Sequence, residues 1–131
     1  MSHRYLVLAA GLSVMGCSDP AGPADALGDW GGEGAAMIAL ADQVTFEFDC
    51  AHGTVAGLLS LDGNGAFEVS GLWVPEGGPI PDPPPEGLPA VFRGRVSGDN
   101  LTLEVDILPR EVTAGPYQLR RDRSPFLRKC L

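Results

Sequence analysis

The sequence predicts an all-β domain, a small antiparallel up-and-down barrel or sandwich of about seven or eight strands closed by one disulfide. Two observations favour this fold class. Apolar and polar residues alternate with a period of two between turn residues that recur roughly every ten residues, as in half-buried antiparallel strands. No helical periodicity follows Met15, and a chain of 131 residues has room for a single hydrophobic core.

The N-terminal residues have the composition of a secretory signal peptide. One arginine within residues 1–4 precedes an apolar run over residues 5–15, which is too short for a transmembrane helix of roughly 20 residues. We therefore expect residues 1–16 to be a signal peptide that is removed from the mature chain.

Residues 14–17, Val-Met-Gly-Cys, resemble a bacterial lipobox. The resemblance implies cleavage before Cys17 and diacylation of that residue, which would anchor the chain to a membrane. Ser18 after the cysteine resembles an outer-membrane sorting signal, so the expected location is the cell envelope, at the outer membrane. The alternative is ordinary secretion, with cleavage after residues 24–26.

Residues 17–29 contain mostly Pro, Gly, Ala and Asp, and this composition predicts a flexible tether. The composition changes at Trp30, so we expect the β-domain to span residues 30–131. The tryptophan itself is expected to close one end of the core.

The expected strands lie between clear turn signals. The clearest strand has apolar residues at positions 44, 46 and 48 on its inner face, and the same alternation places Cys50 there. We expect the chain to turn next at residues 52–53, and again at residues 62–65, where Asp, Asn and Gly suit a hairpin. The expected strands are residues 35–41, 44–50, 54–61, 66–74, 90–96, 101–107, 116–121 and 126–131.

A proline-rich stretch interrupts this pattern. Residues 75–89 hold seven of the twelve prolines, and loops of this length without regular structure are uncommon in compact domains. Consecutive prolines favour a stiff polyproline II conformation, so we expect the loop to project as a solvated excursion.

The cysteines predict one bridge. If Cys17 carries lipid, Cys50 and Cys130 remain as a pair in an oxidising compartment, and chain entropy predicts roughly 4–5 kcal/mol of stabilisation from closing so long a loop. The alternative is two free, buried thiols.

The charge distribution is uneven and acidic overall. The formal net charge is −8, and residues 19–90 contain twelve acidic residues without one Lys or Arg, whereas residues 91–131 contain eight basic residues and five acidic ones. A strongly acidic chain is not expected to bind nucleic acid. The two halves could pair their charges across neighbouring strands, or the basic C-terminal residues could contact an acidic partner.

The sequence offers no catalytic constellation, so we predict no catalytic residues, no cofactor and no metal site. After removal of the signal peptide His52 is the only histidine, which is too few for a zinc site. Any nucleophile and base pair would have to use His52, and no cysteine remains free to act as the nucleophile. His52 has two interpretations, a turn residue whose ring binds backbone carbonyls or a catalytic group. The structural interpretation is favoured.

Three motifs together resemble a group of uncharacterised bacterial secreted proteins and lipoproteins: Trp-Gly-Gly-Glu at 30–33, Phe-Glu-Phe-Asp-Cys-Ala-His-Gly at 46–53 and the terminal Lys-Cys-Leu at 129–131. These motifs contain the residues that we select as candidate functional residues, His52, Asp49, Trp30 and Glu33.

In plan, the expected domain is also similar to the small envelope barrels that inhibit lysozymes or metalloproteases. The favoured function is therefore a lipid-anchored binding or interaction module of the envelope, with an envelope protein as its partner. In one form of this hypothesis the module inhibits that partner. The alternative is a lipocalin-like carrier of a small apolar ligand, which needs the hollow interior that small residues at 35, 39, 57 and 71 leave open. A hydrolase that uses His52 is a third alternative.

Overall fold

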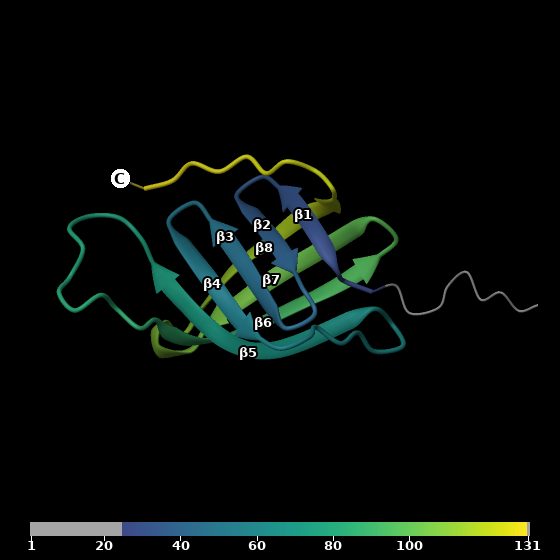
Figure 1. Cartoon of the computed structure of the whole chain (residues 1–131), viewed down its shortest axis with the longest axis horizontal. Coiled ribbons are helices and arrows are strands. Elements are labelled where there is room, and N and C mark those ends of the chain that lie inside the picture. Colours follow the sequence, from purple (N-terminus) through teal and green to yellow (C-terminus); the bar gives the residue numbers. More distant parts are fainter. Residues whose placement is uncertain (1–24, 131) are drawn as a thin grey trace, which may run out of the picture.

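The computed structural model describes residues 25–130, whose eight strands form one closed antiparallel barrel (Figure 1). Each strand pairs with the next along the chain, and β8 pairs with β1 to close the sheet. The predicted all-β fold is confirmed, and of the two predicted architectures the barrel is the one that forms. The elements are β1 (Gly28–Gly32), β2 (Ala35–Ala39), β3 (Gln43–Phe48), β4 (Ala51–Ala56), β5 (Ala66–Pro75), β6 (Leu88–Ser97), β7 (Asn100–Ile107), the 3-10 helix η1 (Leu108–Arg110) and β8 (Val112–Arg121).

The barrel has two distinct ends. We call the first the entry end, because β1 begins there. The β2–β3 turn and the loop that follows β4 also lie at this end. A hydrogen bond joins them, in which Gly57 N donates to Asp42 O over 2.8 Å. At the opposite end, which we call the loop end, β3 passes into β4 and the proline-rich loop joins β5 to β6. This loop projects at the left of Figure 1.

The predicted signal peptide (residues 1–16), the lipidation site Cys17 and the tether up to residue 24 lie outside the described residues. Within residues 25–130, no helix has the length and apolar character needed to cross a membrane. β1 begins upstream of the expected domain boundary at Trp30, and Ala26 is already buried. The physical reason is that the Trp30 indole Nε1 donates to Ala26 O over 2.9 Å, which holds the preceding residues against the core.

Large aromatic side chains occupy the barrel interior. The rings of Phe46 and Phe92 stack with centroids 4.4 Å apart, and both side chains are fully buried. Gly53 and Gly71 lie against the same ring, since an added Cβ would be 2.7 Å from Phe92 Cζ at the first and 3.1 Å from Phe92 Cε2 at the second. The missing side chain at position 71 therefore makes room for an aromatic ring instead of leaving a hollow.

The turn between β3 and β4 lies at residues 49–50, so the predicted turn at residues 52–53 is wrong. Phe48 pairs with Ala51 across the turn, and the following residues continue as β4. Cys50 is consequently exposed. Its alternation with the preceding residues had predicted a place on the inner face, and that prediction is wrong. The glycine at position 53 resembles a turn signal, but it lies within β4. A glycine is needed there because the Phe92 ring packs against it.

The middle of the chain follows the prediction more closely. The predicted strands 66–74, 90–96 and 101–107 match β5, β6 and β7 within about two residues at each end. The hairpin turn before β5 also forms, with Gly65 N donating to Asp62 O over 3.0 Å. By contrast, β4 is shorter and β8 longer than predicted.

The predicted strand at residues 126–131 does not form in the described part of the chain. Residues 122–130, which we call the strap, run back along the outside of the barrel from the end of β8 to the loop end (Figure 1, yellow). Their only β-bridge is the isolated one between Phe126 and Glu33, because the β1–β8 pairing leaves no free sheet edge. Gly31 permits this close approach, since a Cβ there would lie 2.8 Å from Pro125 N.

Candidate functional site

A groove lies at the loop end, between the proline-rich loop and the outer face of β4 and β5. Its volume is about 680 Å³. Three features define it: apolar side chains on the strands, a wall of prolines, and a polar corner near the disulfide. The lining residues are His52, Thr54, Leu72, Val74, Pro75, Glu76, Gly77, Gly78, Pro79, Ile80, Pro81, Pro84, Pro85, Glu86 and Cys130. We call it the loop groove.

The lining combines apolar contact area with negative charge. Ile80 is 82% exposed and Leu72 is 40% exposed, which are large values for aliphatic side chains. The lining includes the carboxylates of Glu76 and Glu86 and contains neither Lys nor Arg. An occupant that suits this surface therefore has an apolar part that contacts the aliphatic side chains and a positively charged group next to that part.

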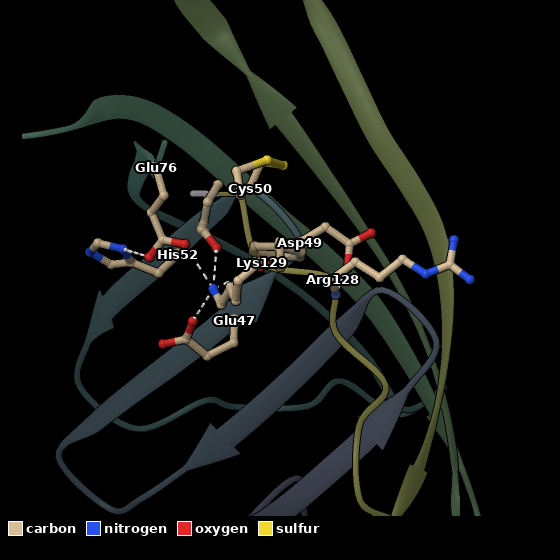
Figure 2. Close-up of polar contacts among 10 residues, drawn as sticks. Glu47, Asp49, Cys50, His52, Glu76, Arg128 and Lys129 are labelled. Atoms are coloured by element: carbon tan, nitrogen blue, oxygen red, sulfur yellow. Dashed lines mark hydrogen bonds and ion pairs between the residues drawn. A yellow bond between two sulfur atoms is a disulfide. The ribbon is translucent and has the colours of Figure 1, made fainter. Parts of the chain in front are cut away.

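A network of charged side chains forms the polar corner of the groove (Figure 2). His52 Nδ1 donates to Glu76 Oε2 over 2.7 Å, and Lys129 Nζ donates to Glu76 Oε1 over 2.8 Å and to Glu47 Oε2 over 2.5 Å. Lys129 Nζ also donates to the backbone oxygens of Phe48 and Ala51, 2.8 and 3.3 Å away. One ammonium group thus joins the strap, the β3–β4 hairpin and Glu76 in the proline-rich loop.

The network shifts the pKa values of its members. Partial burial opposes the ionisation of Glu76, but hydrogen bonds from Lys129 and His52 outweigh this effect and hold the pKa of Glu76 below its ordinary value. Partial burial likewise opposes the charge on Lys129, while hydrogen bonds to Glu47 and Glu76 raise the pKa of Lys129. Both groups are therefore charged at neutral pH.

The strap is fixed beside this network by a disulfide and by Asp49. The predicted bridge between Cys50 and Cys130 is confirmed, and both cysteines are exposed, so the alternative of free buried thiols is wrong. Asp49 Oδ1 accepts the Arg128 backbone N–H over 2.8 Å, and Asp49 O accepts the Cys130 N–H over 3.1 Å. Asp49 thus positions the end of the strap against the hairpin.

The four candidate residues selected from sequence are not one site. His52 and Asp49 lie on either side of Cys50, but His52 is a strand residue paired with a carboxylate, so its interpretation as a turn residue is wrong. Trp30 is buried, with the Arg121 guanidinium 4.3 Å from its ring centroid. Glu33 is exposed in a shallow depression beside Phe126.

Sequence reasoning missed Glu47, Glu76, Ile80 and Lys129. Glu76 had a usable signal, since it is the first charged residue of the proline-rich stretch. Lys129 also had one, because a residue next to a bridged cysteine is held in place by the bridge. The contacts among them depend on a turn that the alternation pattern placed wrongly.

A second hollow, of about 790 Å³, lies on the outer face of β5, β6 and β7. Arg93 and Glu104 line it, and they belong to a charge ladder in which Arg93 Nη2 lies 3.3 Å from Glu104 Oε2 and 2.8 Å from Asp106 Oδ1. All three residues lie within residues 91–131, so this ladder is not the pairing between the acidic and basic halves that the uneven charge suggested. Exposed pairs of this kind contribute little to stability, typically about 0–1 kcal/mol.

Within residues 25–130 no group of three or more His, Cys, Asp or Glu side chains is arranged to hold a metal ion. The His52 ring contacts a carboxylate, and no hydroxyl or thiol in the described range hydrogen-bonds to it. No protein-family model, curated protein or solved structure matches this chain. The family resemblance drawn from the motifs therefore stays a prediction.

Replacing Glu76 by glutamine is expected to weaken the acid dependence of stability. Because the pKa of Glu76 is lower in the folded chain than its ordinary value of 4.5, the unfolded chain binds more protons in this range. The stabilisation from Glu76 is therefore fully present above about pH 4.5 and is lost as the pH falls through the lowered pKa. Thermal melts of the wild type and the Glu76→Gln variant at about pH 7 and about pH 3 measure this difference.

Glu86→Gln is the matched control, because Glu86 lies in the same loop and is exposed. The control should lose as much stability on acidification as the wild type, whereas Glu76→Gln should lose less. Equal losses for all three chains would show that the network does not couple to protonation.

Proposed function

We propose that this chain is a lipid-anchored binding module of the bacterial cell envelope, which captures an extended apolar segment of a partner protein in the loop groove. The observation that carries the proposal is the groove itself. It lies on the outside of a closed barrel, and strongly exposed aliphatic side chains line it beside a fixed charge network.

Two properties of the loop favour a polypeptide segment as the occupant. Prolines restrict the loop, so less conformational entropy is lost when it contacts a partner. The carboxylate of Glu86 lies on the loop side of the groove, and that of Glu76 is shared with Lys129 and His52. A segment with an apolar residue next to Lys or Arg would complement both the apolar surface and the negative charge.

The side chains that fill the barrel interior leave little room for a ligand. The barrel axis holds stacked phenylalanine rings, and glycines accommodate these rings instead of leaving space. A small apolar ligand, as in the carrier alternative, would therefore use the loop groove as well. The projecting loop also suits the inhibitor-like version, in which it would enter a cleft of the partner.

Selection of a random peptide library displayed on phage, against the immobilised chain, tests this function. We expect the enriched peptides to carry an apolar residue next to Lys or Arg. Their affinity should fall at least about tenfold for the Ile80→Asp variant, which corresponds to about 1.4 kcal/mol.

Val112→Asp is the matched control, because Val112 is 50% exposed and lies at the same end of the barrel, outside the groove. Its affinity for the selected peptides should equal that of the wild type. Peptides that bind the Ile80→Asp variant equally well would contradict the groove assignment. No enrichment, together with a small apolar molecule retained in native mass spectrometry, would favour the carrier.

A further inference from the structure

Three exposed leucines gather at the entry end of the barrel. Leu27 directly precedes β1, Leu40 directly follows β2, and Leu58 lies in the loop after β4. The last two are 52% and 56% exposed. The strand register places Leu27 beside Leu40, since Gly28 pairs with Ala39 at this end of the sheet. Gly57 N donates to Asp42 O, which places Leu58 next to the turn that contains Leu40. We call the three leucines the leucine rim.

The chain enters the barrel at this same end, and the entry point is fixed. Arg121 Nη1 donates to Leu27 O over 2.9 Å, and Arg121 Nη2 donates to Asp25 O over 3.1 Å. The same guanidinium lies 3.4 Å from Asp99 Oδ1 and 3.9 Å from Asp25 Oδ1. The direction from which residue 25 arrives is therefore set by contacts with β8, and the charge of Arg121 is locally offset.

The distance from the proposed lipid to the entry end is limited by covalent geometry. Eight peptide units join Cys17 to Asp25, and even a fully extended chain spans at most about 3.6 Å per residue, or about 29 Å in all. A barrel anchored through Cys17 is thus kept within about 29 Å of the membrane by the end that carries the exposed leucines.

We propose that the leucine rim docks on the lipid bilayer, so that the entry end faces the membrane and the loop groove points away from it. This inference rests on the proposed lipid anchor at Cys17. The acyl chains hold the barrel at the surface, and the rim is a second, weaker contact that fixes its orientation. The loop groove is at the opposite end of the barrel and is then presented to partners across the envelope space.

The test uses the lipidated full chain, reconstituted into vesicles of phosphatidylcholine and phosphatidylethanolamine. A cysteine replaces Leu58, or Leu108 as the matched control, and is labelled with an environment-sensitive fluorophore while the disulfide remains closed. Leu108 is 52% exposed and lies after β7, at the loop end of the barrel. Spin-labelled lipid chains in the same vesicles report contact with the bilayer.

We expect the label at position 58 to gain at least about twofold in emission on reconstitution and to be quenched by the spin-labelled lipid, whereas the label at position 108 should do neither. Equal signals at both positions in chains that float with the vesicles would overturn the docking while leaving the anchor intact. If the wild-type chain does not float, or floats as well after Cys17→Ser, the lipid anchor fails and the docking inference fails with it.

Discussion

Replacing Cys50 and Cys130 by serine is expected to lower the free energy of unfolding by about 4 kcal/mol. The two cysteines are 80 residues apart in sequence, so the bridge removes a large share of the freedom of the unfolded chain. The variant also frees the end of the strap, which otherwise holds Lys129 against Glu47 and Glu76. Total stabilities of domains are about 5–15 kcal/mol, so this loss is a large fraction.

Urea denaturation followed by tryptophan fluorescence measures this loss, because both tryptophans, Trp30 and Trp73, are buried in the folded chain. The wild type in reducing buffer is the matched control and should unfold at the same urea concentration as the double serine variant. An unchanged midpoint after either treatment would contradict the role assigned to the bridge.

Replacing Phe92 by alanine is expected to cost about 3–5 kcal/mol. The side chain is fully buried, and its ring stacks on Phe46 at 4.4 Å between centroids. Two of its neighbours, Gly53 and Gly71, have no side chains that could move into the vacated space. The cavity should therefore remain largely open, which places the cost toward the upper part of that range.

The Phe126→Ala variant is the matched control for this substitution. Phe126 lies on the strap and is 58% exposed, so its replacement should cost less than about 1 kcal/mol. The same urea titrations measure both variants. A cost for Phe92→Ala similar to that for Phe126→Ala would show that the aromatic stack does not hold the barrel together.

The strand pattern was predictable where alternation and turn signals agree. β5, β6 and β7 are long strands, turns with Gly and Asn precede β5 and separate β6 from β7, and the inner and outer residues of these strands follow from the period of two. The bridge was predictable because lipidation of Cys17 would leave two cysteines to pair. The fold class could therefore be predicted without knowing which side chains contact one another.

The site was only partly predictable, for two physical reasons. Alternation cannot show where a hairpin reverses, so the pattern of β3 extended to Cys50 and the glycine at position 53 was interpreted as a turn. That error placed His52 in a turn and hid its pairing with Glu76, which lies 24 residues away along the chain. Contacts of the strap with β1 and the hairpin also depend on barrel closure, which no local pattern encodes.

We propose the loop groove, at the end of the barrel away from the chain entry, as the binding surface. Photo-crosslinking of the chain in living cells tests it most directly, with a photoreactive amino acid placed at position 80 or, as a control, at position 112. We predict a discrete protein adduct from position 80 that is absent from position 112 and is suppressed by the selected peptides. Identical adducts from both positions, or none from position 80, would show that the loop groove is not the binding surface.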